Sequence, residues 1–167
     1  IAVGVDEFDA DPWLLNCRNG TLDLRTGTLR PHRREDLVTK LARVEYRPDA
    51  TCPLFDAFLE TTFSGDQQLI EFVLRLLGMG LTGDVREQIL PIFHGDGNNG
   101  KSVLLDTIAA LMGDYASEAP PDLLVVRKGE RHPTELADLL GRRLVVASET
   151  EEGGILRVLL VRSKKDP

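Results

Sequence analysis

The residues of this sequence whose types and spacing best fit a binding site lie in one glycine-rich segment. Residues 95–102 read GDGNNGKS and match the pattern G-x-x-x-x-G-K-[ST], between a predicted strand and a predicted helix. In that setting, consecutive backbone N–H groups and the positive end of the helix dipole form a cradle for the phosphates of a nucleotide. We therefore predict an ATP-binding loop made of Gly95, Asp96, Gly97, Asn98, Asn99, Gly100, Lys101 and Ser102.

Charged and hydroxyl side chains at two places have distinct predicted roles. Lys101 is expected to reach the β- and γ-phosphates, and the Ser102 hydroxyl to complete the octahedral shell of Mg²⁺. Glu149 follows the apolar run LVVAS, at the strand tip where a carboxylate can hold Mg²⁺ through water or polarise the attacking water. Glu151 and Glu152 are close enough in sequence to compete for either role. The catalytic candidates are thus Lys101, Glu149 and Glu151, and the metal candidates are Ser102 and Glu149.

The segments around these residues alternate between strand and helix patterns. The run EQILPIF before the loop predicts a strand, SVLLDTIAALM after it predicts a helix, and residues 144–147 predict a buried strand. Continuous apolar strands that alternate with helices are typical of a parallel sheet covered on both faces. The expected fold class is therefore α/β, with the parallel sheet of a P-loop NTPase. His94, directly before the loop, is interpreted as a packed residue at the strand end.

The first half of the chain predicts a mixed hairpin-and-helix region. The stretch WLLNCRNGTLDLRTGTL has Asn-Gly and Thr-Gly turn pairs between short apolar runs, which predicts an antiparallel hairpin or meander. Apolar spacing predicts helices over residues 53–63 and 67–81, with Asp66 as the cap of the second. Both helices are interpreted as core packing. The predicted organisation is an accessory region at 1–84, the amino-terminal part of an ATPase core at 85–153, and a tail at 154–167.

Composition and charge exclude several classes of protein. The 167 residues carry a formal charge of -7, which argues against a generally basic nucleic-acid-coating protein or a membrane-surface binder. Residues 18–47 hold a local excess of basic side chains, interpreted as ordinary solvated surface. Cys17 and Cys52 match no zinc or redox spacing, which fits a reducing cytoplasm. No apolar run approaches the roughly 18 residues that a membrane span needs, so no membrane contact is expected.

Four segments, in this order, carry a family resemblance. FDADPWLLNCRNGTLDLRTGTLRPHRREDLVTK, CPLFDAFLETTFSGD, GDGNNGKS and RRLVVASETEEG together resemble the phage and plasmid primase–helicase family, with its poxvirus-type primase–helicases and superfamily 3 helicase motor. The resemblance implies an ATP-dependent DNA helicase that acts on single-stranded or forked DNA as a homo-oligomeric ring, usually a hexamer. It also implies a phage, prophage or plasmid gene expressed in the cytoplasm of a bacterial host. By this resemblance, Lys101 corresponds to the Walker A lysine and Glu149 to the Walker B acid.

The tail GILRVLLVRSKKDP, after Gly153, does not match the family, whose motor continues into a third motif and an arginine finger. We expect a truncated or frame-shifted end and an incomplete sheet. An arginine finger is worth about 10³ to 10⁵ in rate, so little ATPase activity is expected from this chain alone. The alternative is a nucleotide-binding or assembly module of a replication complex that does not hydrolyse ATP. A small-molecule kinase is disfavoured because no arginine-rich lid segment follows the loop.

Overall fold

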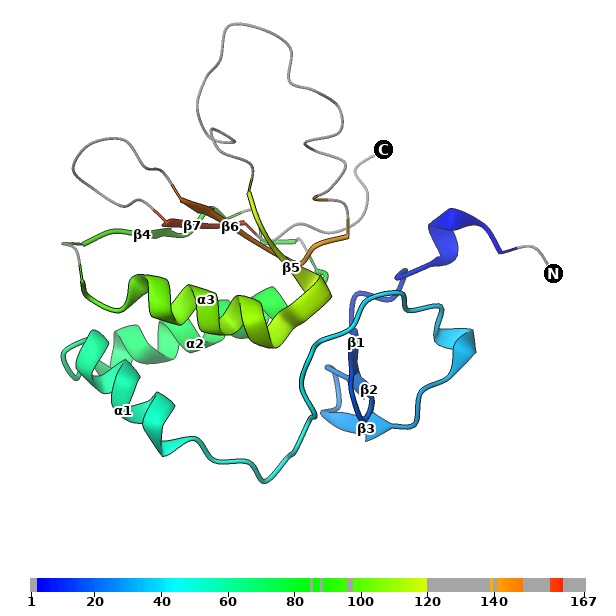
Figure 1. Ribbon diagram of the computed structural model, residues 1–167, viewed down its shortest axis with the longest axis horizontal. Coiled ribbons are helices and arrows are strands. Elements are labelled where there is room, and N and C mark those ends of the chain that lie inside the picture. Colours follow the sequence, from blue (N-terminus) through cyan, green and yellow to red (C-terminus); the bar gives the residue numbers. More distant parts are fainter. Residues whose placement is uncertain are drawn as a thin grey trace, which may run out of the picture.

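Two sheets and three α-helices make up the part of the chain that the computed structural model describes, which comprises residues 3–84, 86–87, 89–95, 98–119, 139, 141–148 and 157–160. The first sheet lies to one side of the helices, and the second sheet lies above them (Figure 1). Short 3₁₀ turns lie at Val5–Glu7, Arg34–Asp36 and Gly113–Tyr115.

The first sheet is a small antiparallel meander of β1 (Leu14–Cys17), β2 (Gly20–Asp23) and β3 (Thr28–Arg30). Leu22 in the central strand pairs with Leu15 on one side and Leu29 on the other. Residues 18–19 connect β1 to β2, with Gly20 as the first residue of β2, and residues 24–27 connect β2 to β3, so the expected meander is confirmed.

Two helices lead from this meander to the second sheet, and a third lies, in the sequence, between the first two strands of that sheet. They are α1 (Pro53–Thr62), α2 (Gln67–Leu81) and α3 (Lys101–Met112). Asp66 caps α2 by accepting a hydrogen bond from the backbone N–H of Leu69 at 3.0 Å, as predicted. In Figure 1, α3 lies directly below the second sheet, and α2 and α1 lie below α3.

The second sheet contains β4 (Ile92–Phe93), β5 (Ala116–Glu118), β6 (Leu144–Ser148) and β7 (Arg157–Leu160), in the order β4-β7-β6-β5. Only β5 and β6 pair in parallel, because β7 runs antiparallel to both of its neighbours. The described sheet is thus mixed, where the sequence pattern led us to expect parallel pairing. The difference arises from the segment RVLL of the tail, whose strand lies between β4 and β6.

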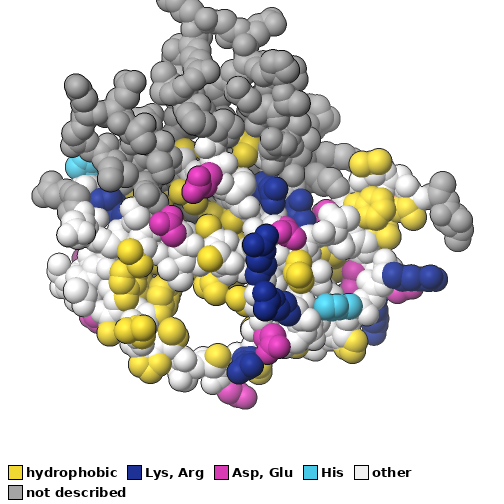
Figure 2. All heavy atoms as spheres, in the orientation of Figure 1, with side chains coloured by type: hydrophobic (Ala, Val, Ile, Leu, Met, Phe, Trp, Pro, Cys, Tyr) yellow, Lys and Arg dark blue, Asp and Glu magenta, His cyan; other side chains and the backbone are white. Residues whose placement is uncertain are grey.

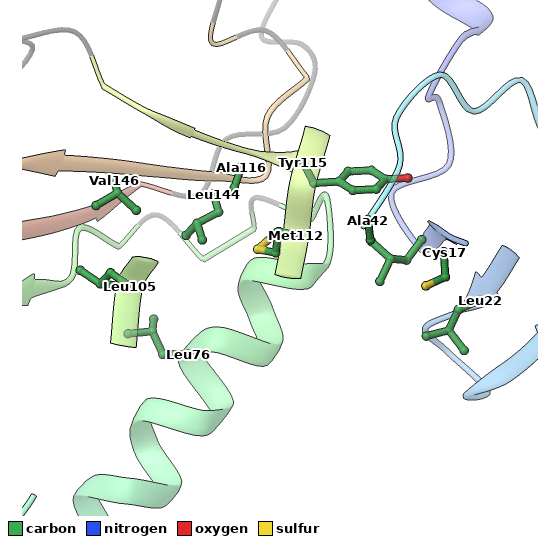
Figure 3. Close-up of a cluster of buried hydrophobic side chains, with 11 residues drawn as sticks. Cys17, Leu22, Ala42, Leu76, Leu105, Met112, Tyr115, Ala116, Leu144 and Val146 are labelled. Atoms are coloured by element: carbon green, nitrogen blue, oxygen red, sulfur yellow. The ribbon is translucent and has the colours of Figure 1, made fainter. Parts of the chain in front are cut away.

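The main core lies where the second sheet, the helices and the meander meet (Figure 3). Leu144 and Leu105 are fully buried between β6 and α3, and Leu76 of α2 packs with them. Tyr115, only 1% exposed, points from the 3₁₀ turn after α3 toward the segment that follows the meander (Figure 3). A second cluster joins the three helices, with Leu59, Ile70, Val73, Leu77 and Leu104 as its buried members.

The meander is tied to the second sheet by a buried arginine directly before β6. Arg143 is 6% exposed, and its guanidinium donates hydrogen bonds to the carbonyl oxygens of Leu81 at 2.6 Å and Leu14 at 2.7 Å. It also lies over the ring of Tyr115, 4.4 Å from the ring centre. Burial lowers the pKa of Arg143, but a guanidinium still stays charged in proteins. One cation therefore connects β1, the end of α2 and the second sheet.

An ion pair between β3 and the 3₁₀ turn that follows it should make the stability of the fold depend on pH. Arg30 contacts both carboxylate oxygens of Asp36 at 2.7 Å and holds the pKa of that carboxyl below its usual range. The pair therefore stabilises the fold above the unfolded-state pKa of about 3.9, and its contribution is lost as pH falls through the lower folded-state pKa. We expect Asp36→Asn to lower the free energy of unfolding by about 1 kcal/mol at neutral pH.

Urea unfolding of the wild type and of Asp36→Asn at several pH values measures this effect. The difference between the two proteins should shrink as the pH falls below about 4, because Asp36 of the unfolded wild type then binds a proton, and it should vanish once the pH is below the lower pKa of the folded protein. Arg34 and Glu35 form a neighbouring but exposed ion pair, so Glu35→Gln is the matched control and should change stability little. A difference that stays constant down to acidic pH would contradict the assigned ion pair.

Candidate nucleotide-binding site

The glycine-rich loop joins the end of β4 to the start of α3 (Figure 1). Gly95, Asn98, Asn99 and Gly100 of the predicted loop belong to the described residues, as do Lys101 and Ser102, which open the helix. The other two loop candidates, Asp96 and Gly97, lie outside the described residues. The expected strand–loop–helix arrangement is therefore present around the part of the loop that the structure describes.

The backbone of the loop takes conformations that its residue types favour. Asn98 and Gly100 both have positive φ, at 63° and 83°, a region that asparagine and glycine enter more readily than other residues. Gly95 has φ of 153°, a conformation that L side chains rarely adopt, and a Cβ there would lie 2.6 Å from Nδ2 of Asn99 and displace that amide. The spacing of small and flexible residues thus produces a tight turn in front of α3.

Lys101 folds back over this turn. Its ammonium donates to the carbonyl oxygen of Gly95 at 2.8 Å and to Oδ1 of Asn99 at 2.6 Å. The side chain is half-buried, so the charge is held at the loop instead of extending into solvent. An ammonium has three donors and can exchange such oxygens for the oxygens of a phosphate.

The start of α3 supplies the other groups that a phosphate needs. The carbonyl of Gly100 accepts the first helical hydrogen bond, from the N–H of Leu104 at 2.9 Å. The preceding N–H groups of the first turn have no partner within the helix, and the helix dipole places partial positive charge there. Ser102 lies in this turn and is half-buried. Backbone N–H groups, an ammonium and a hydroxyl together fit a phosphate with a bound Mg²⁺.

The predicted acids Glu149 and Glu151 lie outside the described residues, but the strand before them is described. Phe93 of β4 and Ser148 of β6 both pair with Arg157 of β7. Because β4 and β6 both run opposite to β7, their carboxyl ends reach the same edge of the sheet at the same level, about 10 Å apart. Ser148, the last residue of β6, therefore lies at the edge where the loop begins, and Glu149 is the next residue in the sequence.

Two features around the loop, the exposure of His94 and the contact with α1, were not predicted from the sequence. His94, which we expect from its position to be packed, is exposed, because β4 lies at the edge of the sheet. Helix α1, interpreted from sequence as core packing alone, also lies against the loop: a Cβ built at Gly100 would be 2.8 Å from Oγ1 of Thr62. Apolar spacing identifies the packed face of a helix but does not show that a loop in the second half of the chain lies against that face.

The basic segment 18–47 is largely neutralised by neighbouring acids. Five of its side chains make ion pairs with carboxylates, and the remaining three make none within the described part of the chain. Figure 2 shows dark-blue basic and magenta acidic side chains mixed on the right of the view, where the meander lies in Figure 1. The expectation of an ordinary solvated surface agrees with this pattern. The paired residues are Arg25, Arg30, Arg34, Arg43 and Arg47, and the others are Arg18, Arg33 and Lys40.

A family model described as "D5 N terminal like" matches residues 1–64, which contain the meander and α1. The chain is also 28% identical over 142 residues to a provisionally named helicase of Acanthamoeba polyphaga mimivirus, a match that covers 81% of this chain. It is 28% identical over 126 residues to a provisionally named helicase of Invertebrate iridescent virus 6, covering 71% of this chain. These similarities support the resemblance to the primase–helicase family and a helicase-like enzyme.

The chain spans only a small part of these relatives, 15% of the mimivirus protein and 13% of the iridescent virus protein. Both relatives come from viruses, and neither supports the expected bacterial host. Within the described residues, no helix has both the length and the apolar character to cross a membrane.

Proposed function

We propose that this chain is the ATP·Mg²⁺-binding part of a superfamily 3 DNA helicase, which couples ATP hydrolysis to duplex unwinding in a longer parent protein. The observation that carries the proposal is the loop between β4 and α3, where Lys101 is held over a turn of the G-x-x-x-x-G-K-[ST] type. The similarity to viral helicases supports the same assignment.

In this proposal, the residues of the loop bind and orient the triphosphate. The N–H groups of the first turn of α3 surround the β-phosphate, and Lys101 exchanges its contacts with Gly95 and Asn99 for phosphate oxygens. Ser102 would hold Mg²⁺ through its hydroxyl, and the bound ion would neutralise charge on the phosphates. The protein contribution is thus mainly positioning and electrostatic stabilisation, as in other phosphoryl transfers.

Glu149 is the proposed acid of the site because it comes directly after Ser148 in the sequence, and Ser148 ends β6 at the edge where the loop begins. In the parent it would orient the attacking water or hold Mg²⁺ through a water molecule, and Glu151 is the second candidate for that role. The parent is proposed to act as a hexameric ring on single-stranded or forked DNA. The neutralised basic segment leads us to expect only weak, salt-sensitive DNA binding by this chain itself.

A competition experiment with adenine nucleotides tests the proposal, with displacement of a fluorescent ATP analogue as the readout. The described site offers its donors to phosphates, so ATP and ADP should compete well. AMP and adenosine should bind at least about 10-fold more weakly than ATP, because both lack the β- and γ-phosphates that make charge-assisted hydrogen bonds with the loop. Adenosine that competes as well as ATP would contradict a phosphate-binding loop.

A further inference from the structure

The carboxyl-terminal turn of α1 lies against the phosphate loop. A Cβ built at Gly100 would be 2.8 Å from Oγ1 of Thr62 and 3.1 Å from Cε2 of Phe58, so the loop backbone lies close to both side chains. Gly100 is also the residue at which the loop turns into α3, with φ of 83°. Figure 1 shows the end of α1 below the start of α3. The backbone of the proposed nucleotide site therefore rests on a helix of the upstream region.

The side chains beneath Gly100 are themselves held in place. The Phe58 ring stacks on Phe55, with 6.2 Å between ring centres and 22° between ring planes. Phe58 also packs against the cluster that contains Leu59 of α1 and Leu104 of α3. Thr62 is half-buried at the end of the helix. Because protein interiors are densely packed, a surface of this kind resists displacement and can fix the loop above it.

We propose that α1 positions the phosphate loop, with Phe58 and Thr62 as positioning residues that hold Gly100 in its left-handed conformation. This inference rests on the proposed ATP-binding function, since it names the part of the chain that keeps the site in shape. The N–H groups after Gly100 must point at the phosphates, and binding sites need their groups held to within about 0.5 Å. The upstream region thereby becomes part of the nucleotide site without contacting the nucleotide.

Coupling of this kind acts in both directions. If the contact between α1 and Gly100 favours nucleotide binding, bound nucleotide must favour the contact by the same factor. ATP·Mg²⁺ should therefore slow hydrogen exchange in the last turn of α1 as well as in the loop. A ligand or neighbouring subunit that moved α1 in the parent would in turn change nucleotide affinity.

Two adjacent threonines provide a matched test. Thr62 faces Gly100, whereas Thr61 is exposed and its hydroxyl donates to the carbonyl of Ala57 at 2.9 Å. We expect Thr62→Leu, which adds bulk against the loop, to weaken ATP·Mg²⁺ binding about 10-fold, because small displacements of site groups have large effects. Thr61→Leu should leave the affinity within about twofold, and Thr62→Ser should retain most of it.

A loss of stability alone must not be mistaken for positioning. Val73 of α2 is 3% exposed and belongs to the same cluster, so Val73→Ala loosens the core without adding bulk at Gly100. Its affinity for ATP·Mg²⁺, measured on folded protein, should match the wild type. Equal affinities of Thr62→Leu and Thr61→Leu would overturn the proposal, and so would an equal loss in Thr62→Leu and Val73→Ala.

Hydrogen exchange without nucleotide separates this inference from the proposed function. Thr62→Leu should speed exchange at residues 98–104, and Thr61→Leu should not. If the wild type binds no ATP but this difference is found, the positioning contact stands and the proposed function fails. If the wild type binds ATP and the exchange at residues 98–104 is the same in both variants, α1 does not position the loop and the inference is overturned. Phe58→Leu provides the same comparison should Thr62→Leu fail to fold.

Discussion

Replacing Arg143 with alanine is expected to lower the free energy of unfolding by about 3 kcal/mol or more. The substitution removes the two hydrogen bonds to Leu81 and Leu14 and the contact with the Tyr115 ring. Leu81 ends α2, so its carbonyl has no partner within the helix and lies at the negative end of the helix dipole. A folded domain is stable by only about 5–15 kcal/mol, so this loss would be a large share of the total.

Urea unfolding followed by circular dichroism measures this effect. Arg75→Ala is the matched control, because Arg75 is an exposed arginine of α2 whose ion pair with Glu71 is worth about 0.5 kcal/mol or less. A second variant, Arg143→Met, fills most of the volume but leaves both carbonyls without a donor. It should therefore remain clearly destabilised. If Arg143→Met is as stable as the wild type, packing rather than hydrogen bonding explains the role of Arg143.

The contacts of Arg143 could not be predicted from the sequence. In the segment GRRLVVAS, an arginine before a buried strand has the pattern of a surface residue. Its acceptors are 62 and 129 positions away in the chain, and no local pattern connects them. The meander, the Asp66 cap and the helices could be predicted, because turn chemistry and apolar spacing are local signals. Long-range contacts such as the one between Gly100 and Thr62 depend on how the elements pack.

The second sheet illustrates the same limit. Residues 144–147 predict a buried strand, and β6 confirms this because all four are buried. Strand β5 has only three residues and follows the 3₁₀ turn at Gly113–Tyr115, so it carries no strand pattern of its own. Strand β7 belongs to the tail. Its backbone pairs antiparallel with both β4 and β6, and the sequence does not indicate this direction. Apolar runs indicate that strands form, but they do not fix the order or the direction of those strands.

The site could be predicted more fully than the sheet that holds it. The pattern GDGNNGKS predicts a tight turn followed by a helix that begins with the lysine, and Gly95, Asn98 and Gly100 have positive φ values that most other residues resist. The expected contact of Lys101 with phosphates remains a prediction. What the pattern could not reveal is that Lys101 is held by Gly95 and Asn99, or that α1 lies beneath Gly100.

Replacing Lys101 with alanine is expected to weaken ATP·Mg²⁺ binding by about 10²-fold or more, because it removes the charge-assisted hydrogen bonds between ammonium and phosphate. Thermal unfolding should change little, since Lys101 is only half-buried and donates to oxygens of its own loop. Lys40→Ala is the matched control. Lys40 adjoins Leu41, which hydrogen-bonds Asp114 near the opposite end of α3, and the variant should bind ATP·Mg²⁺ as the wild type does.

Titration calorimetry of the unmodified chain and of Lys101→Ala with ATP·Mg²⁺ shows whether the loop between β4 and α3 binds phosphates. A phosphate-binding loop predicts heat of binding with the unmodified chain and none with Lys101→Ala at the same concentrations, while both proteins remain folded. Equal affinities for ATP·Mg²⁺ in the two proteins, or no binding by the folded unmodified chain, would contradict a phosphate-binding loop.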